Sequence, residues 1–72
     1  MNEMEMKKMA LELAGIEPTA ENIEYAERHG WLTINTGRDG RKYAWYLDTD
    51  GKEACVDQDG NELSKDIIEI MF

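Results

Sequence analysis

Cysteine and proline are almost absent from this chain of 72 residues, which has one of each. With Cys55 alone, no intrachain disulfide can form, and low cysteine use is typical of a reducing compartment, so we expect a cytoplasmic protein. No stretch is apolar for long enough to cross a bilayer, and the acidic first fifteen residues lack the pattern of a signal peptide. The disulfide-rich secreted class is therefore excluded, and no membrane association is expected.

Basic residues are also scarce, because 8 Lys and Arg stand against 16 Asp and Glu, for a net charge of −8. Nonspecific binding to nucleic acid depends on Lys and Arg that neutralise phosphates, so direct nucleic-acid binding is not expected. The charge equally disfavours an anionic membrane surface. It favours a basic surface on another protein, including one that normally holds nucleic acid.

Three Asp-Gly pairs, at residues 39–40, 50–51 and 59–60, divide the stretch from Trp31 to Leu63. Asp-Gly between alternating segments is a strong signal for a β-hairpin. The stretch therefore predicts an antiparallel β-meander of three or four strands. If each pair forms a two-residue loop, one face of the sheet collects these residues: Leu32, Ile34, Tyr43, Trp45, Leu47, Ala54, Val56 and Leu63. A four-residue loop at 37–40 would keep the same faces.

The opposite face of the predicted sheet is acidic. The same register sets Asp48 opposite Glu53 and Asp57 opposite Glu62, and like charges directly opposite cost about 0.2–1 kcal/mol per pair. Two such pairs indicate either a solvated face screened by salt or an anionic surface for a cationic partner. The predicted members of this face are Trp31, Thr33, Tyr46, Asp48, Glu53, Cys55, Asp57 and Glu62.

Helical patterns precede the predicted sheet. In residues 1–15 apolar side chains recur at i, i+3, i+4 and i+7, and Gly15 suits a helix end. Thr19 is a good N-cap for a second helix over residues 20–29, with Ile23 and Ala26 facing inward. Its outer side carries an acidic ridge. The first stripe consists of Met6, Met9, Ala10 and Leu13, and the ridge consists of Glu21, Glu24 and Glu27.

After the sheet, Ser64 suits the N-cap of a short helix over residues 65–72. Ile68, Ile70 and Phe72 alternate, so a strand stays open for this segment. The predicted fold class is α+β: two N-terminal helices, a three- or four-stranded antiparallel meander with Asp-Gly turns, and a short C-terminal helix. A chain of this length predicts one domain, residues 1–72, with a small core.

No motif for catalysis or metal binding emerges. The segments Asp48–Gly51 and Asp57–Gly60 resemble parts of an EF-hand loop, but the first ligand position would be Tyr46 or Cys55, so hairpin turns explain them better. Cys55 has no recognisable base, because the one histidine is His29 at a helix end. We therefore predict no enzyme, no metal and no cofactor.

The leading hypothesis is a non-enzymatic inhibitor that blocks a basic nucleic-acid-binding site on a host defence protein. It would act as DNA-mimicking anti-CRISPR proteins of phages do, since small acidic chains of this type suit the accessory proteins of mobile elements. The acids Asp48, Glu53, Asp57 and Glu62 would make the contact. Trp31 and Tyr46 would either lie under a helix or act as aromatic anchors within the acidic rim. The ridge Glu21, Glu24 and Glu27 is the second candidate surface.

Two alternatives stay open. The first is a small homo-oligomer, in the simplest case a homodimer, that sequesters a small ligand between subunits, because the methionine-rich first helix and the apolar C-terminus exceed what one small sheet needs to cover. The second is a structural or regulatory interaction domain with a solvated acidic face.

Overall fold

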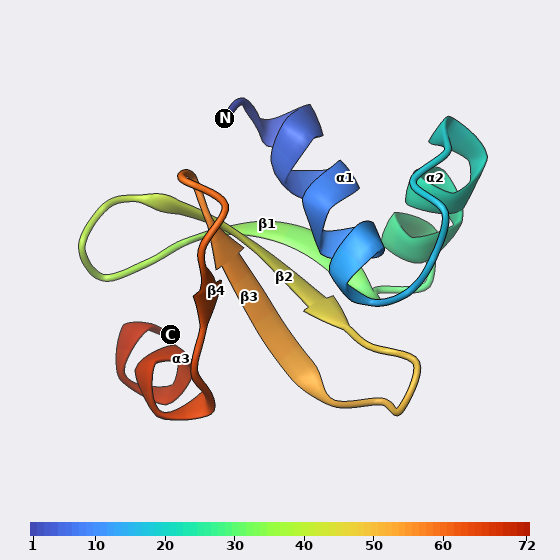
Figure 1. Cartoon of the computed structure of the whole chain (residues 1–72). Coiled ribbons are helices and arrows are strands. Elements are labelled where there is room, and N and C mark those ends of the chain that lie inside the picture. Colours follow the sequence, from blue (N-terminus) through green and yellow to red (C-terminus); the bar gives the residue numbers. More distant parts are fainter.

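The computed structural model describes residues 1–72 as three helices and one four-stranded antiparallel sheet with strand order β1-β2-β3-β4. This confirms the predicted fold class, and the C-terminal segment is a helix (Figure 1). In chain order the elements are α1 (Glu3–Leu13), α2 (Ala20–Arg28), β1 (Leu32–Thr36), β2 (Lys42–Leu47), β3 (Glu53–Asp57), β4 (Glu62–Leu63) and α3 (Lys65–Met71).

Each helix begins at a capping side chain, as the sequence predicts for the second and third. Asn2 and Glu5 form a capping box at α1, and Oγ1 of Thr19 accepts a hydrogen bond from the N–H of Asn22 at 3.1 Å. The hydroxyl of Ser64 accepts from the N–H of Ile67 at 3.4 Å. These bonds satisfy N–H groups that have no partner inside the helix. Local chemistry therefore sets where the helices start.

The register of the sheet differs from the prediction by one residue in every hairpin. Leu32 lies opposite Tyr46, Tyr46 opposite Ala54, and Val56 opposite Glu62. A two-residue type I′ loop would need positive φ at the aspartate as well as the glycine, but only glycines have positive φ in this chain. Each turn is instead a three-residue loop that ends in a left-handed glycine: Gly40, Gly51 or Gly60.

A shift of one residue turns a strand over relative to its neighbour. Three successive shifts leave β1 and β3 facing as predicted and reverse β2 and β4. Tyr46 therefore joins Leu32 and Val56 on the face covered by α1 and α2, whereas Tyr43, Trp45, Leu47 and Leu63 lie on the other face.

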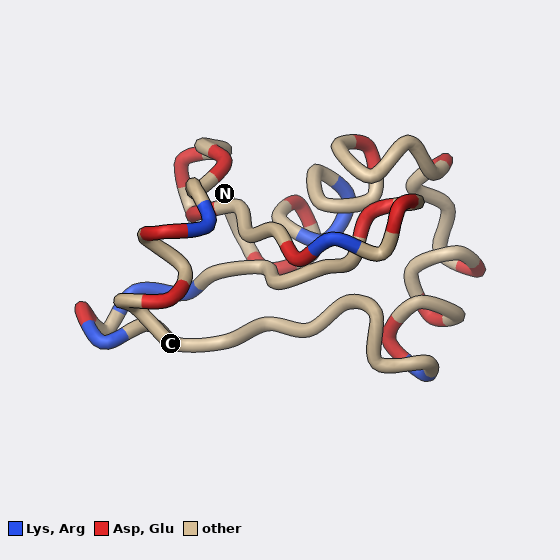
Figure 2. Tube along the Cα trace, turned by 90° about the horizontal axis from the view of Figure 1, so that it is seen from below, with Lys and Arg blue, Asp and Glu red and all other residues tan.

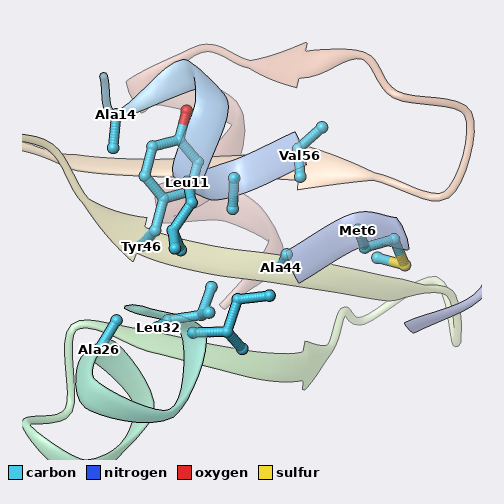
Figure 3. Packing of buried hydrophobic residues seen from close by; sticks show 10 residues of the cluster. Met6, Leu11, Ala14, Ala26, Leu32, Ala44, Tyr46 and Val56 are labelled. Carbon is cyan, nitrogen blue, oxygen red and sulfur yellow. The ribbon is translucent and has the colours of Figure 1, made fainter. Parts of the chain in front are cut away.

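The main core lies between the sheet and the two N-terminal helices. Figure 3 shows Met6 and Leu11 of α1 directed at Ala44, Tyr46 and Val56 of the sheet. Ile23 and Ala26 of α2 are buried, as predicted. In α1 the stripe is partly wrong, because Leu11 is buried and Leu13 is exposed. No helix of the structure is long and apolar enough to cross a membrane.

α3 covers part of the opposite face. Ile68 and Cys55 are buried, and the ring of Phe72 meets that of Tyr43 edge to face, with centroids 5.5 Å apart. The N–H of Arg38 donates to the carbonyl of Met71 at 3.1 Å, which ties the helix to the β1–β2 turn. The fold is thus a sheet between a two-helix layer and a single short helix (Figure 1).

Candidate partner-binding site

The acidic sheet face predicted from the sequence does not assemble. Glu53 lies opposite Leu47, and Glu62 lies opposite Val56, so neither faces an aspartate across the sheet. Asp48 and Asp57 belong to turns: Oδ1 of each accepts two main-chain N–H groups, at 2.8 and 2.9 Å. The one-residue change in register removes both predicted like-charge pairs. These four acids do not share a surface.

The two predicted aromatic anchors are also separated. Tyr46 is only 2% exposed beneath α1, and burial, with Glu62 nearby, raises its pKa to about 12. Its hydroxyl lies 3.4 Å from Oε1 of Glu62. Trp31 lies directly before β1, with its ring against those of Tyr25 and His29, and is 42% exposed. Tyr46 is therefore a core residue, and Trp31 alone is available to a partner.

The acidic ridge of α2 is presented as a continuous surface. The Thr19 cap fixes the start of the helix, and burial of Ile23 and Ala26 fixes its rotation. The ridge residues Glu21, Glu24 and Glu27 are consequently all exposed. Figure 2 shows these acids along one end of the molecule, with Arg28 as the only basic residue of that helix.

A shallow groove runs between the ridge and α1. It has a volume of about 220 Å³ and is lined by Met4, Ala20 and Ile23, with Glu24 and Glu27 at its border. Glu27 is paired with Lys7 at 3.2 Å, whereas Glu24 has no basic group within ion-pair distance. An apolar floor beside a free carboxylate is thus present on the acidic side of the helix layer.

This arrangement suits a lysine or arginine side chain. Such side chains bury their methylene groups against apolar surface while the charged end stays at a polar border. Met4 and Ile23 would contact the methylenes, and the carboxylate of Glu24 would accept a charge-assisted hydrogen bond. Glu21, one turn earlier, extends the negative surface along the helix. The groove therefore combines an apolar lining with negative charge along one side of α2.

An aromatic cluster lies at the C-terminal end of α2, and sequence analysis missed it. The ring of His29 is 4.2 Å from that of Tyr25 and 4.8 Å from that of Trp31, between centroids. Tyr25 and His29 are four residues apart, which places them on one side of a helix. That spacing was the available signal. The cluster holds Trp31 at the start of β1.

Nothing in the structure gathers three or more His, Cys, Asp or Glu side chains in a geometry that would hold a metal ion. Cys55 is buried, and this burial raises the pKa of its thiol to about 11, so the thiol is protonated at neutral pH. No protein-family model, curated protein or solved structure matches the chain.

Proposed function

We propose that this chain is a non-enzymatic binding protein that inhibits its partner by covering a basic nucleic-acid-binding site with the acidic ridge of α2. The observation that carries the proposal is Glu24, an exposed carboxylate without an ion-pair partner at the border of an apolar groove. On the helix, Glu21, Glu24 and Glu27 succeed one another about every 4.5 Å along the axis, a spacing about a third longer than the roughly 3.4 Å per phosphate along one DNA strand.

In its full form, the proposal is that the protein is an inhibitor carried by a mobile element such as a phage. It acts in the cytoplasm on a host defence protein, as DNA-mimicking anti-CRISPR proteins do. The support is the small size, the net charge of −8 and the single cysteine. A surface of this kind attracts a basic groove at long range, and salt weakens that attraction.

The test uses purified bacterial defence proteins that bind DNA, each with a fluorescent duplex. Added wild-type protein is expected to displace the duplex from at least one of them, and 0.5 M salt is expected to weaken direct binding of the protein to that partner. Glu24→Lys should then raise the concentration needed for displacement at least tenfold, which corresponds to about 1.4 kcal/mol.

The matched control is Glu69→Lys, which changes the net charge equally at an exposed position on α3. It should change displacement less than twofold. Equal effects of the two variants would mean that net charge alone matters and would remove the α2 groove from the proposal. No displacement from any protein tested would overturn the nucleic-acid-mimic function for that set of partners.

A further inference from the structure

The outer edge of β1 is open. β1 is the first strand in the order β1-β2-β3-β4 and pairs only with β2. Residues 29–37 contain no Asp, Glu, Lys or Arg and no proline, and they form the long tan stretch along one rim of the molecule in Figure 2. Natural proteins commonly protect an open edge with charges or proline. An edge without either is a template for another strand.

The hydrogen bonds to β2 show which groups of β1 are free. The N–H of Leu47 donates to the carbonyl of Trp31 at 2.9 Å, and the N–H of Gly37 donates to the carbonyl of Arg41 at 2.9 Å. Directly bonded pairs alternate along an antiparallel ladder. The odd-numbered residues therefore bond to β2. The even-numbered residues that direct N–H and C=O groups outward are Leu32, Ile34 and Thr36.

We propose that this edge binds the same edge of a second copy of the chain, forming an antiparallel homodimer with one continuous sheet. A two-fold axis beside Ile34 pairs all three outward residues, because it sets Ile34 opposite its counterpart and Leu32 opposite Thr36. Any other register leaves at least one of the three without a partner. The interface is self-complementary, as a two-fold dimer requires.

The same register gives Trp31 a place on the second copy. It sets Trp31 opposite Gly37, on the same face of the sheet. Beside Gly37 lies a hollow of about 440 Å³ that is also lined by Met71 and Phe72. Phe72 is 43% exposed in the single chain. Pairing of the two edges therefore brings Trp31 of one copy near the exposed end of α3 in the other.

One pair of charges at the two ends of β1 is also complementary, that of Arg38 and Asp48. After β1 comes a basic turn, residues 38–42, which carries Arg38, Arg41 and Lys42 against one aspartate. At the other end, Asp48 lines the same hollow as Trp31. Antiparallel pairing brings the basic turn of one copy to Trp31 and Asp48 of the other. Arg38 has no ion pair in the single chain, so it is free to make this contact.

The experiment follows the mass of the full chain by light scattering and its amide exchange by NMR across a range of concentrations. The mass should rise from 8.3 kDa toward twice that value. Exchange at Leu32, Ile34 and Thr36 should slow at least tenfold with concentration, whereas Thr33 and Asn35, already bonded to β2, should change little. A mass of 8.3 kDa at every concentration would overturn the dimer.

Thr36→Pro removes one outward N–H and no hydrogen bond to β2, so it should yield a folded monomer. Its matched control is Thr36→Val, which keeps the N–H and should still dimerise. Arg38→Glu should weaken dimerisation at least tenfold. This variant still tests the homodimer if the Thr36→Pro variant does not fold. Dimers unchanged in Arg38→Glu, or in a folded Thr36→Pro variant, would overturn the proposal.

Protection of the three outward amides only upon addition of a different protein would assign the edge to that protein and also overturn the homodimer. The second copy occupies β1 and leaves the groove at Glu24 open. Failure of the dimer therefore leaves the proposed function standing, and failure of DNA displacement leaves the dimer standing.

Discussion

Asp57 is a buried acid held in place by the main chain. The residue is 7% exposed, and its Oδ1 accepts the N–H groups of Asp59 at 2.9 Å and of Asn61 at 2.8 Å. A carboxylate out of water is tolerated only when such bonds replace its hydration. The bonds also fix residues 58–60 as a three-residue loop. Asp57 thus sets the pairing of β4 with β3.

We expect Asp57→Ala to lower the free energy of unfolding by about 2 kcal/mol, because it leaves two N–H groups of the turn without an acceptor. Asp57→Asn keeps the Oδ1 acceptor and should recover most of this loss. The more exposed Asp48 makes the equivalent pair of bonds in the β2–β3 turn, so Asp48→Ala should cost less. Urea unfolding measures all three. An alanine variant as stable as the wild type would contradict this role.

In the β1–β2 turn, the carboxylate that accepts a main-chain N–H group comes from a different position. Gly37 stands where the other turns have an aspartate, and Oδ1 of Asp39 accepts the N–H of Arg41 at 3.0 Å. The hydroxyl of Tyr43 donates to the same carboxylate. The bond from Tyr43, followed by that from Arg41, lowers the pKa of Asp39. A Cβ on Gly37 would lie 2.6 Å from the ring of Tyr43, so glycine is required here for space.

At the scale of elements, α2 begins at a favourable N-cap but carries like charges that repel one another on its outer side. The Thr19 cap supports the first turn, and Glu24 lies three residues from both Glu21 and Glu27. Like charges at this spacing destabilise a helix by about 0.2–0.5 kcal/mol per pair. Part of this repulsion is offset where Glu27 meets Lys7. The ridge therefore lowers the stability of the helix that carries it.

We expect Glu24→Gln to raise the free energy of unfolding by about 0.5 kcal/mol at low salt, because it removes two like-charge pairs. The gain should disappear near 1 M salt, where exposed charges are screened. Urea unfolding at both salt concentrations is the measurement, and Glu69→Gln on α3, with Lys65 one turn before it, should show a smaller change. A less stable Glu24→Gln would mean that Glu24 makes a stabilising contact.

The order and type of the elements could be predicted from the sequence because their signals are local. Thr19 and Ser64 mark helix starts within a few residues, and Asp-Gly marks each hairpin. The register could not be predicted in the same way, because Asp-Gly fits both a two-residue loop and the end of a three-residue loop. What separates them is hydrogen bonding by the residue before the loop, such as Asp48, which alternation of side chains does not reveal.

The same distinction between local signals and contacts between segments applies to the candidate site. A helical ridge depends on spacing within one segment, so the exposure of Glu21, Glu24 and Glu27 followed from the sequence. A site on a sheet depends on register between segments, so a shift of one residue dispersed the predicted acidic face and buried Tyr46. The groove at Met4 depends on contact between α1 and α2, which no local pattern specifies.

At the scale of the whole molecule, the sheet has two packed faces that each hold a weak acid. Tyr46 lies beneath α1 and α2, and Cys55 lies on the side of α3. Burial raises the pKa of Tyr46 from 10.0 to about 12 and that of Cys55 from 9.0 to about 11. Each group remains neutral in the folded chain at a pH where it would ionise in the unfolded chain. Alkaline pH therefore acts on both layers of the fold at once.

Because both folded pKa values lie above the unfolded ones, the stability that these groups contribute is complete below pH 9 and is lost as pH rises to 12. We expect the urea midpoint to fall across this range. Tyr46→Phe removes the hydroxyl that titrates and should flatten the decline between pH 10 and 12. The exposed Tyr25 supplies the control, Tyr25→Phe, which should decline as the wild type does. Two results would contradict this expectation: a urea midpoint that stays constant from pH 9 to 12, or midpoints of the two variants that fall equally with pH. Either would show that Tyr46 ionises as readily in the folded chain as in the unfolded one, because its hydroxyl is in contact with water.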